Sequence, residues 1–289
     1  MTLSSLKNFI IINFTLVVLG LFKLYFCYTF DFTVLSYIVS EIIVTTLQLT
    51  RFEQVNKPWL SHSYSHLDNN ERLNAILLYF VMNCSLKGLT HYFIHYTFII
   101  VKHCELPITS IINYISNPLS VVYYYLYFVC VSFVLEIIYD FCHYCLHRYA
   151  HSNVFVYKYI HKTHHLYTNT SAITTFYMSP IDLIISYSVP LYICVGMGMC
   201  FKLIDLTFIS MFTIYLTYQE IGGHLGKSMY PTSSFAQFIW LPRLLGIQLY
   251  TEDHALHHTK INCNYSKRFS LFDLIFGTYK SGIAYRTSE

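Results

Sequence analysis

Six stretches of this chain are apolar over roughly the length that a helix needs to cross a bilayer. They lie near residues 7–27, 30–50, 74–100, 118–139, 181–200 and 203–219. About 20 apolar residues suffice for one transmembrane helix. Only 11% of the 289 residues are charged, whereas soluble domains carry roughly 25%. We therefore predict an all-α integral membrane protein with about four to six transmembrane helices.

Net charge and cysteine content argue against a nucleic-acid-binding protein and against a disulfide-stabilised protein. The formal net charge is only +3, and without a basic run this argues against nucleic acid as a partner. The nine cysteines are odd in number and dispersed, with several inside apolar stretches. This pattern does not indicate a disulfide framework. Cys142 and Cys145 form a single CxxC without a second one, and we interpret them as helix-packing residues.

The chain shows no internal repeat and no low-complexity linker. We expect one continuous domain, with an N-terminal transmembrane region over residues 1–117 and a catalytic region over residues 118–289. No small-residue cleavage site follows the first apolar stretch, so we interpret that stretch as an anchor and not as a cleaved signal.

Histidines gather in three clusters with helical spacing. Residues three or four apart share one face of a helix, and imidazole is the commonest side-chain metal ligand. The ligands are too many for one tetrahedral ion, so we predict two metal ions. Glu220 and His224, also four apart, and His151 are further candidates. The predicted ligands are His143 and His147, then His161, His164 and His165, then His224, and finally His254, His257 and His258.

The types of ligand narrow the choice of metal. Neutral imidazoles suit iron, zinc, copper or nickel, and the thiolate set of a structural zinc site is absent from the sequence. A ligating histidine usually donates its second ring N–H to a carboxylate, carbonyl or water. We expect this role first for Asp140, then for Asp182, Asp253 and Asp273.

The order of the apolar stretches predicts where the clusters lie. The stretches over residues 181–200 and 203–219 form a hairpin, which returns the chain to the side it left. All three clusters can then meet on one membrane face. That face also carries most of the basic residues outside the spans, whereas only Lys102 and Lys202 lie on the other. By the positive-inside rule the histidine face is predicted to be cytosolic.

His91 and His95 form another pair with four-residue spacing, inside the apolar stretch over residues 74–100. No further cluster accompanies this pair. We therefore interpret the two side chains as hydrogen-bonding groups between helices and not as metal ligands.

Several motifs together resemble the fatty acid hydroxylase and sterol desaturase superfamily. Asp140–Phe–Cys–His143–Tyr–Cys–Leu–His147–Arg148 is similar to its first signature, and Tyr159–Ile–His161–Lys162–Thr–His164–His165 to its second. His224–Leu–Gly226 resembles a short His-x-Gly element. Asp253–His254–Ala–Leu–His257–His258, followed by Asn264–Tyr265 and by residues 272–278, is similar to the C-terminal signature. Many members carry His-Pro-x-Glu where this chain has Ser179–Pro–Ile–Asp182.

The resemblance implies an integral protein of the endoplasmic reticulum membrane with a non-haem di-iron centre. It implies that O₂ is a co-substrate and that electrons come from cytochrome b5 or a related reductase. No cytochrome b5 module is visible in the sequence, so the expected donor is a separate protein. The implied reaction is hydroxylation, oxidation or desaturation of a sterol, a fatty-acyl chain or a sphingoid base, with a slight preference for sterols.

Other functions remain open at this point. A metal transporter would place its site near the middle of the bilayer, whereas these clusters follow the ends of apolar stretches. An intramembrane zinc protease would need an HExxH motif, which the sequence lacks. A non-catalytic metal-binding protein or scaffold derived from the same superfamily is the main alternative. The substrate carbon and the oligomeric state stay undetermined.

Overall fold

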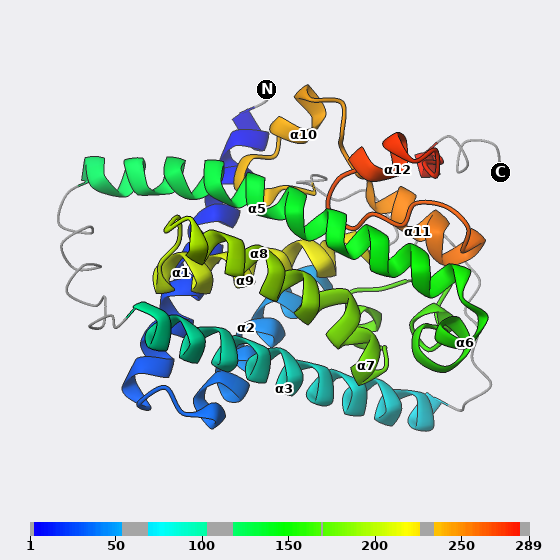
Figure 1. Ribbon diagram of the computed structural model, residues 1–289, viewed down its shortest axis with the longest axis horizontal. Coiled ribbons are helices and arrows are strands. Elements are labelled where there is room, and N and C mark those ends of the chain that lie inside the picture. Colours follow the sequence, from blue (N-terminus) through cyan, green and yellow to red (C-terminus); the bar gives the residue numbers. More distant parts are fainter. Residues whose placement is uncertain (1–2, 54–68, 103–117, 169, 226–233, 284–289) are drawn as a thin grey trace.

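The computed structural model describes residues 3–53, 69–102, 118–168, 170–225 and 234–283. These residues form a helical bundle (Figure 1). Among them the only β pairing is an isolated bridge between Gln248 and Phe269. The predicted all-α class is therefore confirmed.

Five long helices and one composite helix make up the bundle. The composite helix continues from α7 through a π-helical turn, η4, into α8. The bounds are α1 Leu3–Thr29, α2 Val34–Glu53, α3 Asn69–Lys102, α5 Pro118–Ser152, α7 Pro180–Leu183, η4 Ile184–Ser188, α8 Val189–Cys200 and α9 Leu206–Gly223.

Short helices carry or frame the histidine clusters and the C-terminal segment. They are α6 Val154–Val156, η1 Tyr157–His161, η2 His164–Leu166, η3 Ile173–Phe176, η5 Ala236–Phe238, α10 Leu241–Leu244, α11 Thr251–Lys260 and α12 Leu271–Ile275.

Four of the helical segments are long and apolar enough to cross a membrane: Leu6–Thr29, Leu73–Ile100, Leu119–Ser152 and Pro180–Cys200. This number lies within the predicted range. The apolar part of α2, Val34–Thr50, is shorter. Helix α9 occupies the centre of the bundle, and nearly all its side chains from Leu206 to Ile221 are buried. The apolar stretch over residues 203–219 is thus a core helix in this bundle.

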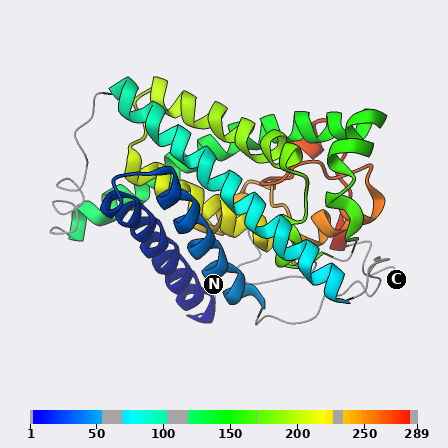
Figure 2. The same ribbon diagram turned by 90° about the horizontal axis from the view of Figure 1, so that it is seen from below.

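The packing of the helices follows from this central position of α9. Helices α1 and α2 pack against α9, α2 packs against α3, and α8 packs against α5. Seen from below, α1 and α2 lie as a pair beside α3 (Figure 2). Helices α2 and α3 approach closely at Gly88, where a Cβ atom would lie 2.7 Å from the Cα atom of Ile38.

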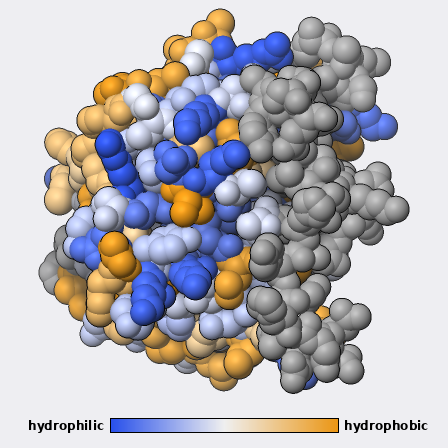
Figure 3. Space-filling model, turned by 90° about the vertical axis from the view of Figure 1, so that its right-hand side faces the viewer, coloured by the Kyte–Doolittle hydropathy of each residue, from blue (hydrophilic) through white to orange (hydrophobic). Residues whose placement is uncertain are grey.

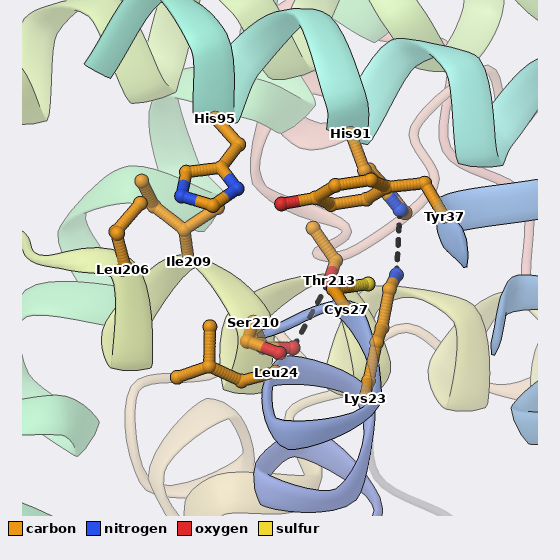
Figure 4. Close-up of a pocket in the computed structure, with 10 residues that line it drawn as sticks. All are labelled: Lys23, Leu24, Cys27, Tyr37, His91, His95, Leu206, Ile209, Ser210 and Thr213. Carbon is orange, nitrogen blue, oxygen red and sulfur yellow. Dashed lines mark hydrogen bonds between the residues drawn. The ribbon is translucent and has the colours of Figure 1, made fainter. Parts of the chain in front are cut away.

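A buried ionic group joins the first three helices. Lys23 Nζ of α1 lies 2.6 Å from Glu41 Oε2 of α2 and 2.6 Å from His91 Nδ1 of α3. The other ring nitrogen of His91 lies 2.8 Å from the Tyr187 hydroxyl. His95 lines the neighbouring small cavity with Lys23 and His91 (Figure 4). The interpretation of His91 as an inter-helix hydrogen-bonding residue is thus confirmed.

The cluster-bearing helices meet at one end of the bundle. The C-terminal end of α5, together with α6, α7 and α11, lies at the right of Figure 1. Viewed from that side, the molecule presents hydrophilic residues in the middle of the face and apolar residues along the left and lower edges (Figure 3). The histidines are buried beneath this polar end.

Candidate metal centre

Nine histidines form two compact groups of potential ligands. Within each group the ligand atoms all lie within 4.8 Å of one another. The two groups adjoin, because the ring centroids of His165 and His258 are 4.7 Å apart. The five-histidine group contains His147, His151, His161, His165 and His257. The four-histidine group contains His164, His224, His254 and His258.

Each HxxHH cluster contributes to both groups. His161 and His165, four residues apart, join the five-histidine group, while His164 between them joins the other. The cluster on α11 does the reverse: His254 and His258 join the four-histidine group, and His257 joins the five-histidine group. The three rings of each cluster stay within 5.8 Å of one another. Residues four apart belong to the same group, and the remaining residue of each cluster belongs to the other group.

Hydrogen bonds at Nδ1 leave the Nε2 lone pairs free. Nδ1 of His147 faces the carbonyl oxygen of Tyr265 at 2.8 Å, and Nδ1 of His257 faces that of Cys263 at 2.7 Å. A carbonyl only accepts hydrogen bonds, so each Nδ1 carries the proton and each neutral ring keeps a bare Nε2. Nδ1 of His161 likewise faces the Asp182 carboxylate at 2.9 and 3.0 Å.

The bare Nε2 atoms of His147 and His161 then face one another without a proton between them. Nε2 of His161 lies 3.1 Å from Nε2 of His147 and 3.0 Å from Nε2 of His165. In the other group, Nε2 of His224 lies 3.1 Å from that of His254 and 3.3 Å from that of His164. Two lone pairs at this distance repel, and a cation between them removes the repulsion.

These spacings fit metal binding. An imidazole nitrogen binds a transition-metal ion at about 2.0–2.1 Å. Two ligands on one ion at roughly right-angled to tetrahedral geometry are then about 3.0–3.4 Å apart. The Nε2 separations of 3.0–3.3 Å agree with this geometry. The residues present therefore fit two metal ions, one for each group.

The protein keeps these imidazoles neutral, which is the form that binds metal. Burial lowers the pKa of His257 from its usual 6.5 to about 3. Burial, reinforced by neighbouring imidazoles, holds the pKa well below its usual range in His164, His165, His254 and His258.

Proline chemistry explains how His143 is oriented. Pro190 has no N–H, so it cannot donate to the carbonyl oxygen of Ser186 four residues earlier. The helix there forms the π turn η4. The Ser186 carbonyl oxygen instead accepts a hydrogen bond from Nδ1 of His143 at 2.8 Å. The Ser186 carbonyl oxygen, which has no N–H partner at Pro190, thus orients His143 of α5.

The loop over residues 263–269 supplies the carbonyl partners of His147 and His257. Two buried carboxylates hold this loop. Asp140 accepts hydrogen bonds from the backbone N–H groups of residues 267, 268 and 269 at 2.7–3.1 Å. Asp273 accepts from those of residues 265 and 266, both at 2.8 Å. These aspartates therefore act on the histidines through the backbone.

The expectation that Asp140 contacts a histidine directly was wrong, because backbone N–H groups occupy its carboxylate. Asp253 is likewise bonded to the backbone N–H groups of Tyr250 and Gly282. Of the four predicted carboxylates, Asp182 is the one with a hydrogen bond to a histidine. The Ser179 hydroxyl caps the first turn of α7 by accepting a hydrogen bond from the backbone N–H of Asp182, and this fixes the position of Asp182.

Three predicted ligands need separate comment. His151 lies inside the five-histidine group. His143 lies outside both groups, although its ring lines the cavity between them. Glu220 also lies outside both: its carboxylate accepts from Lys87 Nζ at 2.8 Å and Lys267 Nζ at 2.7 Å. The Glu220 backbone carbonyl, however, accepts from Nδ1 of His224 at 2.8 Å. Gly226 of the His-x-Gly element lies outside the described residues.

A narrow cavity of about 10 Å³ lies between the two groups. This is about the space that one water molecule needs. Six histidines line it, together with Met178, Asp182, Ser186 and Lys267. Sequence analysis did not identify Lys267 or Lys87. A lysine within an apolar span is itself a signal of function, and that signal was present at Lys87.

Comparison with known proteins agrees with this arrangement. The chain is 31% identical over 146 residues to a fatty acid hydroxylase of Lecanicillium, covering 49% of this chain and 40% of the relative. It is 31% identical over 170 residues to a methylsterol monooxygenase of Aspergillus fumigatus, covering 56% and 51%. It is 29% identical over 141 residues to a Delta(7)-sterol 5(6)-desaturase of Gibberella zeae, covering 49% and 35%.

The chain thus spans about half or less of the length of these relatives. No solved structure matches it. Residues 130–278 match the sequence model of the family described as fatty acid hydroxylase. This segment contains all nine histidines of the two groups and more than half of the chain, and the chain therefore belongs to the fatty acid hydroxylase family.

Proposed function

We propose that this protein is a membrane-bound oxidoreductase that binds two iron ions and uses O₂ to hydroxylate, oxidise or desaturate a lipid. The observation that carries this proposal is the pair of adjoining histidine groups, whose Nε2 atoms face one another at metal-ligand spacing. Imidazole ligands suit iron among other transition metals. The four membrane-length helices support a substrate drawn from the bilayer.

The names of the relatives support the substrate class. They are a fatty acid hydroxylase, a methylsterol monooxygenase and a sterol desaturase. A lipid and an oxidation recur in all three names. We propose a sterol as the substrate, with a fatty-acyl or sphingoid chain as the other candidate.

The residues of the chain have clear tasks in this mechanism. When bound, a pair of redox-active ions with O₂ would supply the oxidant that an unactivated C–H bond requires. The nine imidazoles would hold the ions, and Asp182 and the carbonyl groups of Tyr265 and Cys263 fix three of those rings. Burial of the histidines excludes bulk water, which protects a reactive centre from side reactions.

Electron supply and location complete the proposal. We propose that a separate protein such as cytochrome b5 with its reductase supplies the electrons. We further propose an endoplasmic reticulum location with the histidine groups toward the cytosol. The basic residues Arg148, Lys158 and Lys162 near the first two clusters support that orientation, because cytosolic segments are enriched in lysine and arginine.

Metal analysis and lipid analysis together test the proposal. The purified wild-type protein should contain about two iron ions per chain, one for each histidine group. Cells that express it should contain a lipid with one added oxygen or two fewer hydrogens, measured by mass spectrometry. His164→Ala should lose the metal of the four-histidine group and the new lipid.

His95→Phe is a matched control, because His95 lies outside both groups and its ring packs among the aromatic rings of Phe32 and Tyr37. This variant should keep both ions and the lipid product. Bound metal without any lipid change would instead support a non-catalytic metal-binding protein. Full metal content and turnover in His164→Ala would refute the assignment of the four-histidine group.

A further inference from the structure

A buried triad of charged side chains borders the metal centre. Glu220 of α9 accepts hydrogen bonds from Lys87 of α3 at 2.8 Å and from Lys267 of the C-terminal loop at 2.7 Å. The side chains of Lys87, Glu220 and Lys267 are only 0%, 1% and 8% exposed. Charges this deeply buried are expensive to desolvate, so a role beyond helix packing is worth seeking.

The triad carries more positive than negative charge. Two ammonium groups share one carboxylate, which leaves one net positive charge. Burial lowers the pKa of Lys267, and the adjacent Glu220 carboxylate raises it back toward its usual range.

The two lysines differ in what else they face. The Lys87 ammonium lies 4.3 Å from the ring centroid of Tyr187 and 5.2 Å from that of Phe176. Cation–π contacts with these two rings therefore also stabilise the Lys87 ammonium. Lys267 instead lines the cavity between the histidine groups. Its ammonium has three N–H donors, of which Glu220 takes one.

The cavity contains one other charged side chain. Asp182 also lines it, but both of its carboxylate oxygens lie within hydrogen-bond distance of Nδ1 of His161. The Asp182 carboxylate is thus already hydrogen-bonded to Nδ1 of His161, on the side of the ring away from Nε2. Lys267 is the cation among the described residues that face the cavity.

We propose that the Lys267 ammonium is an anion-binding group, which holds an anion about the size of a water molecule, such as hydroxide or fluoride, in the cavity beside the two histidine groups. The cavity volume of about 10 Å³ limits the ligand to this size. This inference rests on the proposed function, because it concerns the space next to the bound metals. The same fixed charge would favour the reduction of O₂, since reduction adds negative charge.

Fluoride is a suitable probe because it is about the size of a water molecule, and its affinity can be measured without turnover. Wild-type protein, purified in detergent with its own metal, is first analysed for metal content and then titrated with sodium fluoride by calorimetry. Lys267→Met should keep the metal and bind fluoride roughly tenfold to hundredfold more weakly, as expected for loss of one hydrogen bond between charged groups. Lys267→Arg should retain most of the affinity.

Lys87→Met is the matched control. It removes the same charge from the same triad, but from the side of Glu220 away from the cavity. In both variants Glu220 keeps one lysine partner, so neither leaves a buried carboxylate alone. Fluoride affinity in Lys87→Met should stay within about threefold of wild type. Should Lys267→Met fail to fold, Lys267→Gln makes the same charge change with a polar side chain.

The outcomes separate this inference from the proposed function. Wild-type protein that binds no metal would overturn the proposed function and the inference with it. Normal metal content with equal fluoride affinity in wild type and Lys267→Met would overturn the inference alone. Equal weakening by Lys87→Met and Lys267→Met would also overturn it, because overall charge and not the cavity-facing ammonium would then be responsible.

Discussion

Replacing Asp182 by Asn should lower the affinity of the protein for one metal ion and leave its affinity for the other unchanged. Asp182 is the partner of Nδ1 of His161, with its two oxygens at 2.9 and 3.0 Å. His161 belongs to the five-histidine group, and among the described residues Asp182 makes no hydrogen bond to the four-histidine group. An Asn side chain can still accept the hydrogen bond, but it removes the charge that raises the basicity of the ring.

The size of the effect follows from the role of such partners. Loss of a carboxylate behind a ligating histidine typically lowers metal affinity 10- to 100-fold. This corresponds to about 1.4–2.7 kcal/mol in binding free energy. Only one of the two ions should bind more weakly, so Asp182→Asn should release its metal in two separate steps.

Dialysis against increasing concentrations of a chelator, followed by metal analysis, measures both steps. Asp205→Asn is a control, because Asp205 caps α9 through the backbone N–H of Phe208 at 2.7 Å and contacts no ligand. Because asparagine caps a helix about as well as aspartate, this variant should lower the free energy of unfolding by less than about 1 kcal/mol and leave both metal affinities unchanged. Equal weakening of both ions by Asp182→Asn, or no weakening at all, would refute the assignment of Asp182 to one ion.

Replacing His257 by Ala should remove the ion of the five-histidine group, and replacing His258 by Ala the ion of the other, because these neighbours belong to different groups. Metal analysis of the two purified variants checks this, and loss of the same ion from both would contradict it. Acid should destabilise the metal-free protein: the pKa of His257 is about 3 in the folded protein against 6.5 usually, so between these pH values unfolding takes up a proton. Stability should then fall as pH decreases below about 6, by roughly 1.4 kcal/mol per pH unit for this residue, and thermal unfolding of chelator-treated protein measures it. Glu41→Gln should lower the free energy of unfolding by about 3–5 kcal/mol, because Lys23 would lose its buried anionic partner at 2.6 Å; unchanged thermal stability in detergent would argue against that pair.

The sequence predicted the bundle and the gathering of the histidines better than their surroundings. Apolar length is a local property, so the long helices were predictable from the sequence, although α5 continues from the predicted end at residue 139 to Ser152. Spacing of three and four residues also identified the histidines that the fold brings together. It could not assign them to two ions, because the second cluster passes from the π turn η1 to the short helix η2. The direction of His164 relative to His161 depends on that irregular backbone.

The partners of the ligands depend on contacts between distant segments. The carbonyl oxygen of Tyr265 reaches His147 across 118 residues of sequence, and no local pattern indicates such a pair. Asp140 is the first of the predicted carboxylates, but its carboxylate turns toward the loop over residues 267–269. Asp182 was identifiable as a candidate, yet its partner His161 became clear only from the fold.

The N-terminal helices take part in building the metal centre, although the family match begins at residue 130. The side-chain amide of Asn83 on α3 donates to the carbonyl oxygens of Phe176 and Met178 at 2.7 and 3.0 Å. Met178 lines the cavity between the histidine groups. On the same helix, Lys87 shares Glu220 with Lys267, which also faces that cavity. Because Asn83 of α3 thereby holds the segment that carries Met178, a residue outside the matched segment helps to shape the cavity without any change among the histidines.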